Sequence, residues 1–214
     1  EGTGEDSEGR TITTHFPSSA QVWTYTPCSS MYVADVEERR QGYNTGFKRH
    51  VRRTQRNRGE GRVLVAGDMN VAPRATDARV PRHLEGLAIP STKAYEREDW
   101  RTLCEEANLA DAADTWEATP SMTWQKPGKS GFTMRIDHVL VPKPRAQQLG
   151  ETIDDPALTS FSVGPITYNS DHRPLRFSYE RPQANPTETP VEPKEPIAAA
   201  PSQGPIAATT THSR

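Results

Sequence analysis

The sequence has little that would anchor it in a membrane or cross-link it. Only 33% of its 214 residues are hydrophobic, and no apolar run approaches the roughly 18 residues that a spanning helix needs. We therefore expect no membrane partner. The two cysteines, Cys28 and Cys104, are too few for a disulfide framework or a metal-ligand cluster, so a reducing compartment is the simpler interpretation. The net charge of -2 does not indicate a nucleic-acid partner, so local charge matters more.

The ends of the chain differ in composition from the middle. Residues 1–8 are acidic and rich in glycine, and we expect them to be frayed. Residues 181–214 contain seven prolines spaced among Ala, Thr, Glu and Ser. Such a composition cannot bury a core and predicts a disordered tail. Residues 9–180 are long enough for one domain with a sizeable core.

Hydrophobic patterning predicts both strands and helices in this domain. Alternating residues predict a hairpin over 10–16 and 21–25, and stripes at helical spacing predict helices over 35–58 and 96–108. Further strands are expected over 63–66, 135–141, 158–163 and up to about residue 179. The connection 73–95 is long and the stretch 109–134 looks irregular. This mixture of strands and helices indicates the α/β class.

The C-terminal half of the first predicted helix is strongly basic, with six Lys and Arg residues between Lys48 and Arg58. A solvated face near a helix C-terminus is the simplest explanation. The alternatives are a patch that follows phosphates or a localisation signal. Together with the Pro-rich tail, this segment predicts a nuclear protein. Gly42 and Gly46 in the same helix suggest close packing against a neighbour.

The most informative stretch is 62–72, where the apolar run Val63–Ala66 suits a strand buried on both faces. After Gly67, Asp68 and Asn70 follow two residues apart, which in an extended segment places both side chains on one side. Open α/β folds often place their chemistry at such strand ends. The alternative is an Asx-type turn in which both residues cap backbone groups.

Three further pieces lie at or near the ends of predicted strands: Tyr25, Asp137 and the pair Asp171-His172. Asp137 lies between apolar positions, where a carboxylate is costly unless it has a partner. Because a catalytic His needs an orienting acceptor, Asp137 beside His172 would satisfy both residues. Tyr25 is either a packed rim residue or a hydroxyl aimed at a phosphate. Carboxylates with an amide and an imidazole also suit a hard cation such as Mg²⁺, which favours phosphodiester hydrolysis.

Two of these segments resemble the signature motifs of the endonuclease/exonuclease/phosphatase superfamily: Gly-Asp-Met-Asn-Val-Ala at 67–72 and Ser-Asp-His-Arg-Pro-Leu at 170–175. The branch resembled is the exonuclease III type of apurinic/apyrimidinic (AP) endonuclease. Supporting elements occur in the family's order: Glu8-Gly9-Arg10, Tyr25-x-Pro27, Glu96-Arg97-x-x-Trp100 and Arg135-Ile136-Asp137. The resemblance implies a four-layer αββα sandwich, in which two packed mixed β-sheets are flanked by helices.

The resemblance also implies roles for five residues. Asp68 would activate or orient the attacking water, with Asn70 beside it. His172, held by Asp137, would contact the scissile phosphate, and Tyr25 would donate to a phosphate oxygen. The expected metal ligands are Asp171, Asp68 and Asn70, and the expected metal is Mg²⁺, with Mn²⁺ as a substitute.

The chain departs from the family pattern in three places. The family has a further N-terminal portion with a metal-binding Glu, and nothing before Gly9 supplies it. Cys28 stands where an Asn is common, and Met134 stands where an aromatic often lines the abasic-site pocket. We therefore expect an N-terminally truncated domain that is weakly active or inactive alone.

The resulting hypothesis is a DNA-repair phosphodiesterase of base excision repair. It would act as a monomer on double-stranded DNA with abasic sites, as an AP endonuclease with 3′-5′ exonuclease capacity. Two alternatives stay open. One is a phosphatase or RNA nuclease of the same superfamily, against which the Glu96-Arg97-x-x-Trp100 element argues. The other is a degenerate, non-catalytic DNA-binding module.

Overall fold

The computed structural model describes residues 8–29, 34–116, 121–128, 131–143, 158–167 and 169–179. These residues all belong to one compact unit, 1–184. Residues 1–7 of the predicted frayed end and the predicted tail 181–214 lie outside the described residues. Within the described part, no helix is long and apolar enough to cross a bilayer.

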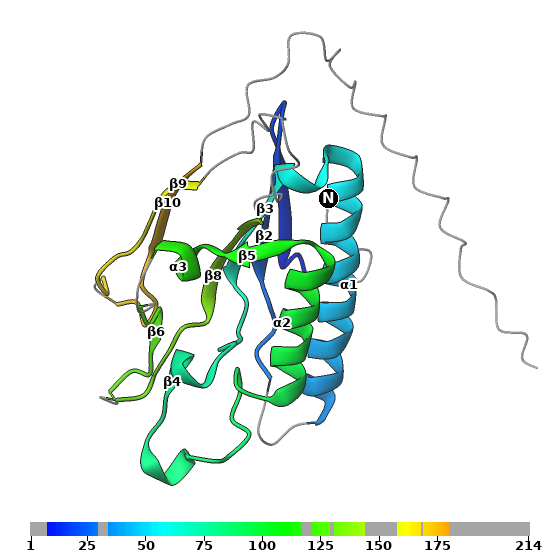
Figure 1. The fold of residues 1–214 in the computed structure, drawn as a ribbon. Coiled ribbons are helices and arrows are strands. Elements are labelled where there is room, and N and C mark those ends of the chain that lie inside the picture. Colours follow the sequence, from blue (N-terminus) through cyan, green and yellow to red (C-terminus); the bar gives the residue numbers. More distant parts are fainter. Residues whose placement is uncertain are drawn as a thin grey trace, which may run out of the picture. The chain divides into compact units, whose positions relative to one another are not determined.

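The framework is a five-stranded mixed sheet (Figure 1). Its first two strands, β1 (Thr11–His15) and β2 (Ala20–Tyr25), form the predicted antiparallel hairpin. Strand β3 (Val63–Asp68) pairs with β2 in parallel. Strand β8 (Asp137–Pro142) is antiparallel to β3, and β5 (Leu109–Asp111) is antiparallel to β8. Strand β3 therefore lies in the middle of the sheet.

Two long helices pack on one face of this sheet (Figure 1). They are α1 (Ala34–Arg58) and α2 (Ala94–Glu106), so both predicted helices are confirmed within a few residues at their ends. Their apolar stripes meet β2, β3, β5 and β8 in one buried cluster. The expectation of close packing at Gly42 is wrong: this residue is exposed, and a Cβ placed there would meet no atom within 4 Å.

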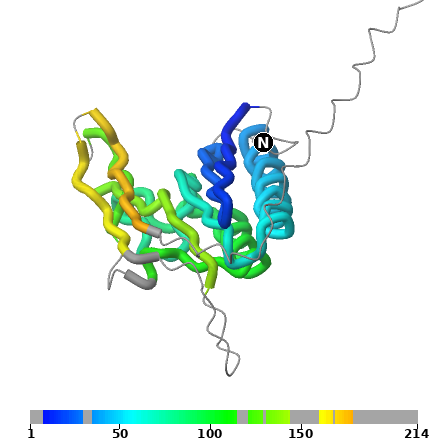
Figure 2. Tube along the Cα trace, turned by 90° about the horizontal axis from the view of Figure 1, so that it is seen from above, coloured from blue at the N-terminus to red at the C-terminus, as the bar shows by residue number. Residues whose placement is uncertain are grey.

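The opposite face of the sheet packs against a second β layer. Strands β9 (Leu158–Val163) and β10 (Leu175–Tyr179) form an antiparallel pair, and α3 (Ala112–Trp116) lies beside it. Figures 1 and 2 show this pair on the side of the sheet away from α1 and α2. Alternate residues of β3 contribute to the two cores. Val63 and Val65 face the helices, and Leu64 and Ala66 face the β9–β10 pair. The strand is thus buried on both faces, and the α/β class with two β layers is confirmed.

A third, small sheet contains β4 (Ala78–Arg79), β7 (Thr133–Met134) and β6 (Trp124–Gln125). Short 3-10 helices at Glu60–Arg62, Ala75–Asp77 and Arg82–Leu84 complete the described elements. The prediction that 109–134 is irregular is wrong, because β5, α3, β6 and β7 lie there. Strands of two or three residues are too short to produce a readable alternation.

Candidate active site

Three of the predicted site residues lie on neighbouring strands of the five-stranded sheet. In the strand register Tyr25 pairs with Asp68, and Asp68 pairs with Asp137. Gly67 makes the approach of β2 to β3 possible: its φ is 139°, and a Cβ at this position would lie 2.0 Å from the carbonyl oxygen of Thr24. Only glycine tolerates both conditions. The sheet thus positions the two carboxylates side by side.

Asp68 and Asn70 are held together by a turn. The backbone N–H of Asn70 donates to Asp68 Oδ1 at 2.9 Å, and its side-chain Nδ2 donates to Asp68 Oδ2 at 3.2 Å. Nδ2 also donates to the carbonyl of Thr26 at 2.9 Å. Asn70 adopts a φ of 46°, so the segment is not extended. The two side chains meet through an Asx-type turn, and the extended geometry expected from the sequence is wrong.

His172 lies against Asp137, as the sequence analysis predicted. Its Nδ1 is 2.9 Å from Asp137 Oδ2 and 3.2 Å from Oδ1. This hydrogen bond raises the pKa of His172, while partial burial opposes the shift. Asp137 is itself oriented, because its backbone N–H donates to the hydroxyl of Thr123 at 3.0 Å. Nδ1–H donation to the carboxylate directs Nε2 of the imidazole away from Asp137.

The two adjacent carboxylates create an electrostatic conflict. Burial, followed by the negative charge of Asp137, raises the pKa of Asp68 to about 6. Asp68, Asp137 and His172 offer ligand atoms that all lie within 4.8 Å of one another, and they form the metal-compatible cluster of the described residues. A cation would relieve the repulsion between two carboxylates, and oxygen-rich donors suit hard divalent ions. The residues present therefore fit such an ion.

Asp171 has a different setting from the one expected. It does not belong to this cluster of three, and its Oδ2 accepts a hydrogen bond from the indole Nε1 of Trp124 at 2.8 Å. The backbone carbonyl of Asp171 accepts a hydrogen bond from Gln125 N–H at 2.9 Å. The backbones of Trp124 and His172 also pair in the antiparallel β manner. Strand β6 thereby holds the Asp171-His172 pair next to the sheet.

Tyr25 lies at the rim of the site, with 56% of its surface exposed. The guanidinium of Arg10 lies 4.9 Å from the centre of its ring and also donates to the Tyr25 carbonyl at 3.2 Å. Glu8 in turn accepts hydrogen bonds from Arg10 and Arg39. The Tyr25 ring is thus packed on a cation at a position accessible to a ligand, which leaves both of the interpretations open.

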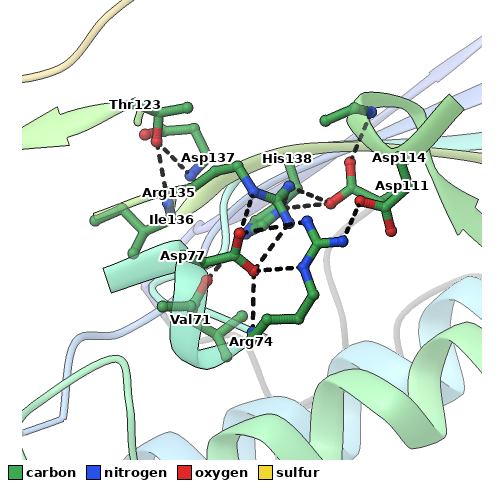
Figure 3. Close-up of polar contacts among 12 residues, drawn as sticks. Val71, Arg74, Asp77, Asp111, Asp114, Thr123, Arg135, Ile136, Asp137 and His138 are labelled. Carbon is green, nitrogen blue, oxygen red and sulfur yellow. Dashed lines mark hydrogen bonds and ion pairs between the residues drawn. The ribbon is translucent and has the colours of Figure 1, made fainter. Parts of the chain in front are cut away.

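A buried ionic network supports the site, and most of its contacts are not predictable from the sequence (Figure 3). Arg135, only 2% exposed, makes two bonds of 3.0 and 3.1 Å to Asp77 and pairs with Asp111. Asp111 also contacts His138 Nδ1 at 2.8 Å, and His138 Nε2 donates to the Val71 carbonyl at 2.9 Å. The network therefore joins Arg135 and His138, which lie on either side of Asp137 in sequence, to Val71, which directly follows Asn70.

The Glu96-Arg97 element has structural contacts. Glu96 is buried and accepts from the backbone N–H of Lys93 at 2.9 Å, which caps the start of α2. Arg97 donates to the Ala72 carbonyl at 3.0 Å. This element therefore fixes the segment that follows Asn70, while neither side chain is among the described members of the carboxylate and histidine cluster.

The site combines a pair of carboxylates, a supporting amide and a His oriented by a carboxylate. These groups lie at strand ends of a fold with two packed β layers, as is typical of an α/β phosphoesterase. A model of the endonuclease/exonuclease/phosphatase family matches residues 30–172, about two thirds of the chain. The chain belongs to this family.

Solved structures with similar folds agree with this assignment. A 3′-5′ exonuclease from Neisseria meningitidis has a TM-score of 0.63 and 19% identity, over 80% of this chain and 65% of that one. An AP endonuclease from Leishmania major has a TM-score of 0.66 and 22% identity, over 85% and 57%. An AP endonuclease from Archaeoglobus fulgidus has a TM-score of 0.63 and 17% identity, over 82% and 67%. The chain thus spans only part of these neighbours. A search of curated proteins found no match.

Proposed function

We propose that the chain carries the catalytic residues of a DNA-repair phosphodiesterase that incises DNA at abasic sites, with 3′-5′ exonuclease capacity, in a Mg²⁺-dependent reaction. The observation that carries this proposal is the cluster of Asp68, Asp137 and His172, placed at the strand ends of a fold shared with two AP endonucleases and a 3′-5′ exonuclease. Double-stranded DNA with an abasic site is the proposed substrate.

Each residue has a role that its environment supports. Asp68, with its pKa raised to about 6, accepts a proton from the attacking water or orients that water. Asn70 fixes the Asp68 carboxylate through two hydrogen bonds. His172, whose Nδ1–H donates to Asp137, presents Nε2–H to a phosphate oxygen when protonated. The exposed Tyr25 hydroxyl donates to another phosphate oxygen.

Asp68 and Asp137 are the residues best placed to hold Mg²⁺. Asp171, next to His172 in sequence, lies outside this cluster and accepts a hydrogen bond from Trp124. When bound, the ion would supply neutralisation of the negative charge on the phosphate. Mn²⁺ has the same preference for oxygen ligands and is the proposed substitute.

A second candidate is removal of a 3′ phosphate. One Neisseria neighbour, with a TM-score of 0.67 and 18% identity, is a 3′ phosphatase bound to a product DNA hairpin. Phosphate removal and backbone incision both require a positioned water and an oriented phosphate, so the cluster suits either reaction.

The deciding experiment is cleavage of a duplex that contains a single abasic-site analogue, in Mg²⁺ and in EDTA. It uses the wild type, Asp137→Asn and the matched control Asp99→Asn. Asp99 is a half-buried carboxylate on α2 that bonds Asn44 and Lys48, away from the cluster. We expect incision 5′ to the lesion in Mg²⁺, weak with this chain and stronger in a version extended at its N-terminus. In the more active of the two, Asp137→Asn should lose at least about 100-fold, and Asp99→Asn should change little.

Parallel substrates separate the alternatives. Preferential turnover of poly(A), a phosphoinositide or a 3′-phosphorylated end would reassign the substrate. DNA binding without Mg²⁺-dependent turnover would favour the non-catalytic module. A version extended at its N-terminus tests the expectation that an upstream metal ligand is needed, and absence of incision at both lengths would refute the proposal.

A further inference from the structure

Arg40 on α1 is a buried cation that the proposed chemistry does not use. It is 2% exposed, as deeply buried as core aliphatic residues. Its Nη1 donates to the carbonyl of Pro27, and its Nη2 donates to the carbonyl of Met69 at 2.8 Å. Both partners are neutral backbone groups. A buried arginine with such partners is expensive, so its position calls for an explanation.

The two carbonyls lie in the two segments that deliver site residues. Pro27 follows Tyr25 by two residues, just after the end of β2. Met69 lies between Asp68 and Asn70, just after the end of β3. These segments are adjacent, since the N–H of Thr26 donates to the Asp68 carbonyl at 2.8 Å. One guanidinium therefore joins both strand ends from the side of the sheet covered by the helices.

The chemistry of arginine suits this task. Its planar fork presents fixed N–H donors that bind two acceptors at a set separation, whereas a lysine ammonium is a single point on a flexible stem. Burial acts to lower the pKa of Arg40, and the negative charge of Glu96 acts in the opposite direction. Arg40 and Glu96 line the same small pocket of about 30 Å³ between α1, α2 and the segment that follows β3. Burial has the larger effect, so the pKa of Arg40 lies below its ordinary value, and the charge of Glu96 offsets part of that effect.

We propose that Arg40 is a positioning residue: it clamps the Pro27 and Met69 carbonyls and so sets the Tyr25 hydroxyl relative to the Asp68 carboxylate. This inference rests on the proposed phosphodiesterase function. Arg40 touches neither substrate nor metal. Its loss changes the position of the Tyr25 hydroxyl relative to the Asp68 carboxylate.

The test compares three variants, each made in the 214-residue chain and in the version extended at its N-terminus. Arg40→Met removes both donors with similar bulk, and Arg40→Lys restores the charge and one donor. Gln55→Met is the matched control, because Gln55 lies on the same helix, is also 2% exposed, and donates to the Ala107 carbonyl at 2.7 Å at the far end of α2. Incision of abasic duplex is measured well below each variant's unfolding midpoint.

We expect Arg40→Met to lower kcat by about 10- to 100-fold with KM changed less than about threefold, as loss of a supporting contact does. Arg40→Lys should recover part of this loss, and Gln55→Met should keep the wild-type kcat although it also lowers the unfolding midpoint. If Arg40→Met keeps kcat, or if both Met variants lose it equally, the positioning role is refuted.

Hydrogen exchange separates this inference from the proposed function. In Arg40→Met, the backbone amides of Thr26 and Met69 should exchange at least about tenfold faster than in Gln55→Met at equal global stability. Absence of cleavage of abasic DNA by both the wild-type chain and its N-terminally extended version would refute the proposed function, and the exchange comparison would then decide on Arg40 by itself. Equal exchange in the two variants would overturn the clamp.

Discussion

Gly67→Ala should be among the most damaging small substitutions in the molecule. Gly67 immediately precedes Asp68 and lies in the parallel ladder between β2 and β3. The added Cβ would lie 2.0 Å from the Thr24 carbonyl oxygen, about 1.3 Å inside the roughly 3.3 Å at which carbon and oxygen make contact. Its φ of 139° is also a conformation that alanine strongly disfavours.

These two effects set the size of the loss. A strained backbone conformation costs about 1–3 kcal/mol, and overpacking a buried position costs about 1–3 kcal/mol more. The sum, about 2–6 kcal/mol, is a large fraction of the about 5–15 kcal/mol by which a domain is stable. Movement of β3 away from β2 would also displace Asp68 from Tyr25, so activity should fall with stability.

Gly42→Ala is the matched control. Gly42 lies in α1, is exposed, and has open space where the Cβ would be. This change should stabilise the protein by about 0.5–1 kcal/mol, because glycine is a poor helix former. Equilibrium unfolding in urea, followed by circular dichroism, gives both free energies. If the two variants differ by less than about 1 kcal/mol, β2 and β3 do not approach each other as closely as described.

Two further predictions concern the polar contacts around the site. Burial acts to raise the pKa of Asp77, but hydrogen bonds from Arg135 and Arg74 lower it below its ordinary value. The stability from these contacts is therefore complete above about pH 4 and is lost as the pH falls through the lowered pKa. Urea midpoints measured from pH 6 to pH 2.5 should fall less steeply in Arg74→Met than in the wild type, and parallel curves would contradict this. Trp124→Phe keeps an aromatic ring but removes the hydrogen-bond donor to Asp171. It should lower the free energy of unfolding by about 1 kcal/mol in thermal unfolding and slow cleavage about tenfold. An unchanged rate would show that this contact does not orient the Asp171-His172 pair.

Long and strongly patterned segments were predictable from the sequence. The apolar run before Gly67 and the helical stripes of α1 and α2 each bury many side chains, so local pattern and tertiary packing agree. The contact between Asp137 and His172 was predictable for a different reason. A carboxylate within a buried strand needs a partner, and a catalytic His needs an acceptor.

Other features depend on contacts that no local pattern carries. Arg135 binds Asp77 and Asp111, which lie 58 and 24 residues earlier in the chain, and the only local signal is a charged residue before a strand. Arg40 looks like one more cation on a basic helix, although its side chain is buried. The turn at Asn70 was foreseen only as the alternative to an extended end, because its φ of 46° is decided by hydrogen bonds to Asp68 and Thr26.

Tyr25, Asp68 and Asp137 are aligned across three neighbouring strands. This alignment depends on the number of residues in β3 more than on which aliphatic side chains the strand carries. Aliphatic exchanges within β3 would leave this alignment intact. Deletion of one residue from the same strand would turn Asp68 toward the opposite face of the sheet, since the side-chain period of a strand is two. Recombination or loop grafting must therefore keep the number of the six positions from Val63 to Asp68, and also the turn that follows them, which places Asn70 and the Met69 carbonyl.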